Sequence, residues 1–212
     1  MDNINVNGLM ITVGIEQRGN LIKKSVQNFF DQDYPFKVLH VLNQGKESIK
    51  ELFPNCSIKE YFTKTIGITN LRNELLNKID WGEICVQWDD DDLKPINYIA
   101  TLHEIIIREK CDGVISKGVH FYDNNVNKIS LLNSRLGAPN SFFFKKNNII
   151  YKGESVGEDV GFATKYVHKH NVCFIDLPII KIVHNNNVSE RRKGESIYDK
   201  DILEHEYGNW FE

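Results

Sequence analysis

The sequence predicts a layered α/β domain built on a central mixed, mostly parallel sheet flanked by helices. Short apolar runs alternate with amphipathic helical patterns, which is typical of strands and helices that follow one another in a layered domain. The 212 residues, of which 41% are hydrophobic and 26% charged, are enough for one sizeable core. No internal repeat or low-complexity linker divides the chain. We therefore expect one continuous domain over 1–212.

The first half, 1–92, shows a β-α-β-(α)-β-α-β pattern with the order of a Rossmann-like, nucleotide-binding half. A "YP" turn ends the first helix, and Pro95 suits the first turn of the helix that follows this half. The expected strands are 9–15, 36–43, 57–63 and 83–88, and the expected helices are 21–32, 68–80 and 96–110. In such sheets, ligands bind beyond the carboxyl ends of the strands.

The second half, 93–212, has a mixed pattern that adds strands and a wall of the site. The turn residues "DNN" (123–125) predict a hairpin between 112–122 and 126–133. A loop over 137–140, a helix over 157–170, strands over 172–176 and 179–184, and a last helix over 197–206 are expected to follow.

Composition excludes several classes of protein. The net charge of −3 gives no global attraction to nucleic acid or to an anionic membrane. The four cysteines are far apart, with no C-x-x-C pair, which favours reduced thiols. No apolar run approaches the ~20 residues of a membrane span, and no basic start precedes an apolar segment, so we expect a cytoplasmic protein without a membrane anchor.

The stretch "VQWDDDDLKP" (86–95) joins a buried strand directly to four aspartates, Asp89 to Asp92. Mg²⁺ and Mn²⁺ take carboxylate ligands, and Asp89 and Asp91 have the spacing to share one ion. A solvated acidic turn is the alternative, and the cluster alone does not decide between the two.

Four motifs in order resemble glycosyltransferases of the GT-A fold, especially the inverting family 2 type. The opening "ITVGIEQRGNLIKKSVQNFFDQDYPFKVLHVLNQG" is similar to their first β-α-β unit, and "GITNLRNELLNKIDWGEICVQWDDDD" is similar to their R-N helix and D-x-D strand end. "GEDVGF" (157–162) and "IIKIVHNNNVS" (179–189) resemble their E-D motif and closing strand. The resemblance covers nearly the whole chain and implies that the second half carries the acceptor and the catalytic group.

The resemblance implies a metal site and a nucleotide site. Asp91 would bind Mn²⁺ or Mg²⁺, Asp89 would contact the ribose or the metal's water shell, and His184 would be a further ligand or diphosphate contact. The implied nucleotide contacts are Gly14, Glu16, Arg18, Asn43, Arg72, Asp89 and Asp90. Asn43 stands where the family commonly has an aspartate that accepts the uracil N3–H. An asparagine can accept this bond or donate one, which leaves the base open, with uridine expected.

The same resemblance implies the groups that act on the sugar and the acceptor. Asp159 would be the general base, with Glu158 as runner-up or acceptor contact; both are also plausible first-turn acids of a helix. The loop Gly137, Ala138, Pro139 and Asn140 would line the donor sugar or the acceptor, or would simply connect two strands. Arg191, Arg192 and Lys193 would contact the diphosphate, with a solvated basic turn as the alternative.

The expected function is therefore metal-dependent transfer of a sugar from a nucleotide-diphosphate sugar to a hydroxyl of a glycan or glycoprotein. One alternative is a non-catalytic module that binds a divalent metal or a nucleotide. Another is a sugar nucleotidyltransferase, although "VGIEQRGN" lacks that class's glycine-rich loop. The chain is short for a free-standing family member, which suits one domain of a longer polypeptide. Its content of Asn, Lys and Ile resembles that of small viral transferase domains, which would place it in a host cytoplasm.

Overall fold

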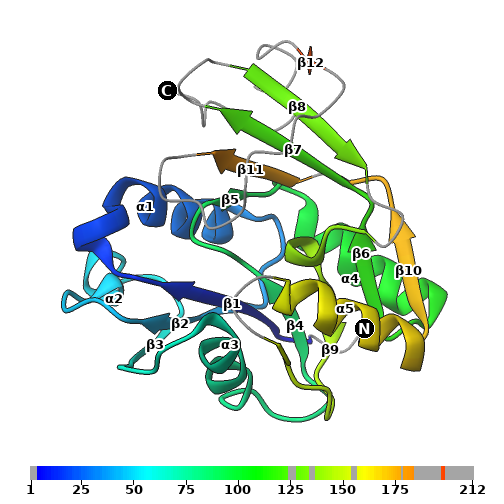
Figure 1. The fold of residues 1–212 in the computed structure, drawn as a ribbon, viewed down its shortest axis with the longest axis horizontal. Coiled ribbons are helices and arrows are strands. Elements are labelled where there is room, and N and C mark those ends of the chain that lie inside the picture. Colours follow the sequence, from blue (N-terminus) through cyan, green and yellow to red (C-terminus); the bar gives the residue numbers. More distant parts are fainter. Residues whose placement is uncertain are drawn as a thin grey trace.

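The computed structural model describes residues 4–123, 128–133, 137–153, 157–177, 179–183 and 197–198. Its centre is a seven-stranded sheet with the order β10-β6-β9-β4-β1-β2-β3 (Figure 1). These strands are β1 (Val6–Thr12), β2 (Lys37–Asn43), β3 (Ile58–Phe62), β4 (Ile84–Gln87), β6 (Gly113–Ser116), β9 (Phe143–Lys145) and β10 (Val172–Ile175). All of them run parallel except β9, which lies antiparallel between β4 and β6. The predicted α/β class with a mostly parallel sheet is confirmed.

Helices cover both faces of this sheet and close two hydrophobic cores. One face packs against α1 (Ile15–Asp31), α2 (Ile49–Leu52) and α4 (Tyr98–Glu109). The other packs against α3 (Ile68–Leu76) and α5 (Glu158–Lys169). The apolar positions of each helix recur on one side, so burying that side against the strands removes it from water. The result is a three-layer arrangement.

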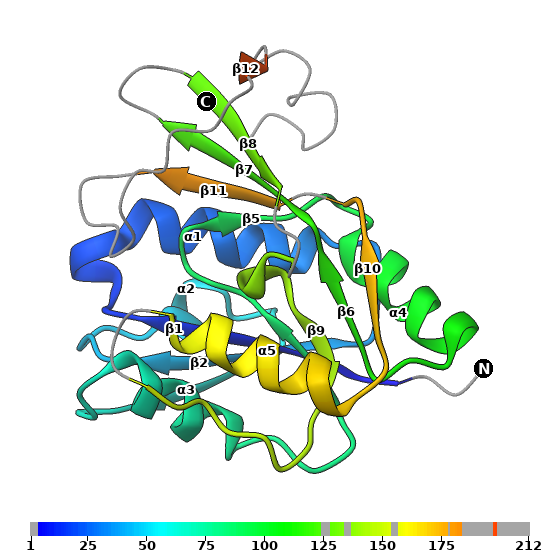
Figure 2. The same cartoon turned by 45° about the vertical axis from the view of Figure 1, so that its right-hand side comes forward.

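A second sheet lies beyond α1, with the order β12-β8-β7-β11-β5 (Figure 2). Its strands are β5 (Asp92–Leu93), β7 (Gly118–Asp123), β8 (Lys128–Asn133), β11 (Ile179–Val183) and β12 (Ile197–Tyr198). The predicted hairpin is confirmed as the antiparallel pair β7 and β8. The segment 112–122 is two strands, however, because the chain leaves the main sheet at Ser116 and joins the second sheet at Gly118. The Ser116 hydroxyl secures this step through bonds with the N–H and C=O of Gly118.

Several boundaries differ from the prediction, and β1 is Val6–Thr12 rather than 9–15. Helix α1 begins at Ile15 rather than at residue 21, and its backbone departs from helical geometry at Arg18 (φ −135°, ψ 26°). The expected helix over 197–206 is wrong at its start, because Ile197 and Tyr198 form β12 and pair antiparallel with β8. A pairing with a strand some 65 positions away is tertiary context that local propensity does not contain. Residues 199–206 lie outside the described part of the chain.

The four cysteines are free thiols, as the spacing predicts, with Cys85 and Cys111 buried. Within the described residues, no helix combines the length and apolarity needed to cross a membrane.

Candidate functional site

The acidic turn after β4 is held rigidly against α1. Trp88 is fully buried, and its indole N–H donates to the carbonyl of Ser25 at 3.0 Å. The Ser25 hydroxyl in turn donates to the carbonyl of Asp89 at 2.9 Å. The Trp88 ring also packs edge-on against Phe29, with ring centroids 5.0 Å apart. These contacts place the aspartates at the carboxyl edge of the main sheet, where they were expected.

The four aspartates divide into a group of three and a single residue. Asp89, Asp91 and Asp92 each offer a carboxylate oxygen within 4.8 Å of the others. Asp90 turns away and pairs with Arg18, its Oδ1 lying 2.6 Å from Nη1. Sequence reasoning treated Asp90 and Asp92 alike, but the structure brings Asp92 into the group and places Asp90 on the side of α1. We refer to Asp89, Asp91 and Asp92 as the acidic cluster.

The acidic cluster carries charge that burial makes costly. Burial, with Asp91 and Asp89 adding to it, raises the pKa of Asp92 to about 7 against the pull of Lys181 and Lys94. Burial and Asp91 likewise raise the pKa of Asp90 to about 6. Burial would also raise the pKa of Asp89, but Arg72, together with Lys181 and Lys94, outweighs it and holds that pKa below its ordinary value. Three hard oxygen donors in a buried group fit Mg²⁺ or Mn²⁺, whose charge would offset this repulsion.

Arg72 on α3 connects the acidic cluster to the start of α5. Its guanidinium donates to Asp89 at 3.2 Å, to Gln87 at 3.1 Å and to Glu158 at 3.1 Å. Burial alone would lower the pKa of Arg72, but its anionic neighbours, Asp89 foremost, raise it above its ordinary value. The guanidinium therefore stays charged and fixes the position of two buried carboxylates.

Glu158 and Asp159 have different surroundings although they are adjacent. Glu158 is buried and accepts the bond from Arg72. Asp159 is half-buried, and within the described residues its carboxylate accepts only the N–H of its neighbour Val160. Asp159 nevertheless acts electrostatically on both Arg72 and Lys181, so it lies close to the acidic cluster. Of the pair, Asp159 has the freer carboxylate.

The loop 137–140 contacts the acidic cluster directly. The Asn140 amide donates to Asp92 Oδ2 at 2.7 Å, and the Ala138 N–H donates to the Ser116 carbonyl at 2.6 Å. Gly137 has φ +77°, and the side chain of Ile115 fills the place that a Cβ would take. The loop is therefore anchored to β6, and Asn140 becomes part of the site.

Two lysines near the acidic cluster were missed by sequence reasoning. Lys181 lies directly across from Asp92 in the antiparallel pair of β11 and β5, with its Nζ 4.0 Å from Asp92 Oδ1. Lys94 is fully buried, with its Nζ 4.7 Å from the centre of the Trp88 ring. A lysine inside the apolar run "IIKIV" was a visible signal for Lys181, whereas nothing in the sequence singles out Lys94.

The loops after β1 and β2, where the base would lie, are closed against each other. Asn43 is fully buried; its oxygen accepts the Gly45 N–H and its amide donates to Glu60. Glu16 accepts the N–H groups of Lys46 and Glu47, and a Cβ on Gly14 would lie 2.5 Å from the Gly45 Cα. The structure therefore brings these predicted residues together but engages Asn43 internally.

The remaining predicted site residues, His184, Arg191, Arg192 and Lys193, lie outside the described residues.

Solved structures share this architecture. The structure of S. aureus TarS 1–349 in complex with UDP superposes with a TM-score of 0.68 at 18% identity, over 85% of this chain and 61% of that chain. The mannosyltransferase PcManGT from Pyrobaculum calidifontis, in complex with GDP-Man and Mn²⁺, superposes with a TM-score of 0.62 at 15% identity. It matches 86% of this chain and 58% of its own. The chain has the GT-A fold.

The acidic cluster lies at the carboxyl edge of this GT-A sheet, where the D-x-D resemblance placed it. The chain spans about three fifths of the length of these two neighbours. No protein-family model matches the sequence, and no curated protein matches it. At these identities the likeness concerns the fold, so the function has to be argued from the site.

Proposed function

We propose that the chain is a metal-dependent glycosyltransferase domain that moves a sugar from a nucleotide-diphosphate sugar to an acceptor hydroxyl. One observation carries the proposal. The acidic cluster at the carboxyl edge of a GT-A sheet is joined through Arg72 to Glu158, the residue that directly precedes Asp159 in the first turn of α5. Cation-binding and proton-accepting groups are thereby held in one connected site.

The acidic cluster would hold Mn²⁺ or Mg²⁺, with Asp91 as the principal ligand and Asp89 and Asp92 beside it. When bound, the ion would offset the negative charge that the leaving diphosphate gains as its bond to the sugar breaks. Side chains of the protein itself supply the other electrostatic interactions of the site. Arg72 keeps Asp89 ionised and oriented toward the cluster. The Asn140 amide donates to one oxygen of Asp92 and so holds that carboxyl group in place.

Asp159 would act as the general base. As the acceptor oxygen attacks the anomeric carbon, its proton passes to the Asp159 carboxylate, and the nucleoside diphosphate leaves from the opposite face. This geometry inverts the anomeric configuration. Support comes from the freer carboxylate of Asp159 and from the Arg72–Glu158 pair, which fixes the first turn of α5 beside the cluster.

The nucleotide is proposed to be uridine diphosphate, bound beside the loops that contain Gly14, Glu16 and Arg18. TarS was solved with UDP and PcManGT with GDP-Man, so both bases fit this fold. Asn43 is not proposed as a base contact, because its side chain is occupied by Gly45 and Glu60. The loop 137–140 is proposed to line the donor sugar or a glycan or glycoprotein acceptor.

The direct test is hydrolysis of a panel of UDP- and GDP-sugars in the presence of Mn²⁺, followed by transfer to a small glycoside. We expect Asp91→Asn to reduce turnover at least 100-fold, and Asp159→Asn to abolish transfer while donor binding, measured by calorimetry, is retained. Asp80→Asn, an exposed carboxylate outside the site, is the matched control. If Asp91→Asn matches wild type, the metal role is wrong. Donor binding without turnover in the wild type would instead support a non-catalytic binding module.

A further inference from the structure

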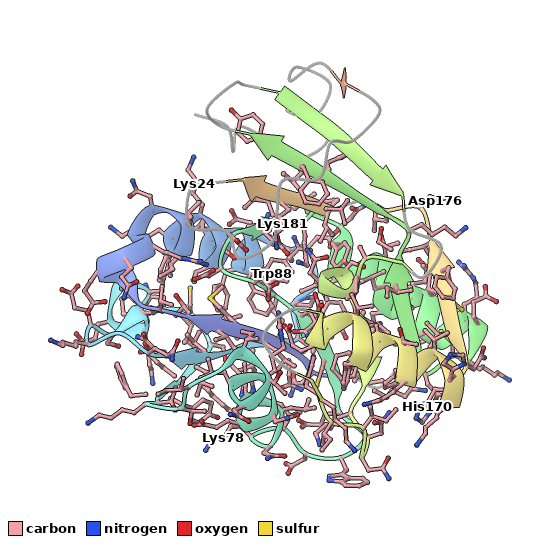
Figure 3. The ribbon with its side chains drawn as sticks, viewed as in Figure 1. Lys24, Lys78, Trp88, His170, Asp176 and Lys181 are labelled. Carbon is pink, nitrogen blue, oxygen red and sulfur yellow. The ribbon has the colours of Figure 1, made fainter. Side chains whose placement is uncertain are left out.

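The pairing of β11 with β5 brings a lysine into the site from a distant part of the chain. Lys181 lies directly opposite Asp92 in this antiparallel pair, and its Nζ is 4.0 Å from Asp92 Oδ1. In Figure 3, Lys181 lies between β11 and Trp88, on the side of the second sheet that faces the main sheet. Its position therefore depends on the second sheet and not on the acidic turn itself.

The oxygen that faces Lys181 has no hydrogen-bond donor among the described residues. Asp92 Oδ2 accepts the Asn140 amide, whereas Oδ1 is buried and accepts no bond from the described part of the chain. A distance of 4.0 Å is an ion pair without a hydrogen bond. The Lys181 ammonium thus balances charge at the acidic cluster while its three donors are not used on Asp92.

A second lysine beside Asp92 shows why access matters. Lys94 also lies next to the acidic cluster, but it is fully buried, and its Nζ lies over the rings of Trp88 and Tyr98. No ligand can reach it there. The Lys181 side chain keeps 19% of its surface exposed, so its ammonium can meet a molecule that enters the site.

We propose that Lys181 binds the diphosphate of the donor, as a cation of the chain itself that acts beside the metal. Without a ligand, Lys181 balances Asp92. When a diphosphate enters, the ammonium donates to a phosphate oxygen, and a metal ion bound by the acidic cluster would then offset the charge of Asp92. This inference rests on the proposed function, since it names a further diphosphate contact of the same site.

The test measures two affinities in three variants. Mn²⁺ alone is titrated by electron paramagnetic resonance, and inorganic pyrophosphate is titrated by calorimetry at saturating Mn²⁺, since a bound ion is proposed to balance Asp92 when the diphosphate enters. Lys181→Met should bind Mn²⁺ several-fold more tightly, because a competing positive charge is gone. It should bind pyrophosphate roughly tenfold more weakly, because a charge-assisted hydrogen bond is lost. Lys181→Arg should keep the pyrophosphate affinity within a few-fold. Circular dichroism spectra check that each variant folds.

Lys94→Met is the matched control, since it changes a second lysine beside the acidic cluster at a position that no ligand reaches. It should weaken pyrophosphate binding less than Lys181→Met does, because the buried Lys94 side chain cannot donate to a phosphate oxygen. The inference is overturned if Lys181→Met binds pyrophosphate like wild type, if both methionine variants weaken it equally, or if the wild type binds none. Hydrolysis of the sugar donor is read separately. If the donor is hydrolysed but Lys181→Met binds pyrophosphate like wild type, only this inference is wrong. If pyrophosphate binding depends on Lys181 but no donor is turned over, only the proposed transferase activity is wrong.

Discussion

The loops at the carboxyl edge of the main sheet fall into two parts, after β1 and β2 and after β4. The two parts differ in whether their polar side chains have hydrogen-bond partners. After β1 and β2, the polar side chains bond to one another, as Asn43 does to Glu60 and Glu16 does to the backbone of Lys46. After β4, the acidic cluster is buried without enough donors, and Asp92 Oδ1 has none among the described residues. The first part is closed by its own contacts. In the second part, the described residues leave a buried oxygen of Asp92 without a donor, and a bound cation could meet it.

This difference separates structure from function at neighbouring positions. Buried polar groups that are fully bonded cost little and stabilise one arrangement of the loops. A surplus of buried carboxylates is costly unless a cation enters. An excess of buried carboxylates therefore indicates the ligand site more directly than the acidic composition of the turn does. Each prediction below removes one element of this contrast.

The largest expected effect comes from Arg72, the buried cation that bonds to Asp89 and Glu158. Arg72→Met should lower the free energy of unfolding by about 3–5 kcal/mol, because two buried carboxylates lose their partner. Urea denaturation measures this. The control is Arg108→Met, whose pairs with Glu104 and Glu109 are exposed and should contribute little to stability. Equal effects of the two variants would contradict the role of Arg72.

The surplus of charge should also appear as a pH dependence of metal-free protein. The pKa of Asp92 is about 7 in the folded chain and near 4 when unfolded, so between these values the folded state binds more protons. Stability should therefore fall by about 2–4 kcal/mol as the pH rises from 4 to 7, and then level off. Asp90, with a pKa of about 6, acts in the same direction.

Asp92→Asn should flatten most of this slope, whereas Asp80→Asn should leave it unchanged. Denaturation in EDTA at several pH values measures both. A wild-type protein that is more stable at pH 8 than at pH 6 would show that ionisation of the buried carboxyl groups does not destabilise the folded state.

The contact between the loops after β1 and β2 can be disrupted at Gly14, where φ is +103° and the Gly45 Cα leaves no room for a Cβ. Gly14→Ala should cost about 2 kcal/mol more than Gly82→Ala, because Gly82 has φ +84° but no atom within 4 Å of the added Cβ. Thermal denaturation of the two variants isolates the contact between the loops. Similar losses would mean that the loops are not packed as described.

The smallest effect is expected at Asn43. Asn43→Asp restores the residue common in the resembled family, but it sets a carboxylate against Glu60 where an amide now donates at 2.8 Å. Stability should fall by about 1–2 kcal/mol. Adding Glu60→Gln should recover it, since the glutamine amide can donate to the new carboxylate. If Asn43→Asp is neutral by itself, Asn43 is not committed to this internal bond.

The sequence was informative where a local pattern determines the position of a side chain. The strand before Asp89, the helix that carries Arg72 and the helix that begins with Glu158 follow from apolar periodicity and motif order, and the structure brings all three together. The different directions of Asp90 and Asp92 were not predictable, because they depend on Arg18 and on pairing with β11. Lys181 comes from some 90 positions away for the same reason. Strand β12 replaced a predicted helix through pairing that is absent from the local sequence.

The most direct measurement is the change in thermal stability caused by UDP and GDP, each with Mn²⁺ and with EDTA, in wild type and in Asp91→Asn. A ligand that binds only the folded state raises the melting temperature according to its affinity. The account predicts a larger rise for one nucleotide with Mn²⁺ than with EDTA, and loss of that difference in Asp91→Asn. Equal shifts with Mn²⁺ and EDTA in both proteins, or no shift at all, would contradict a metal-assisted nucleotide site at the acidic cluster.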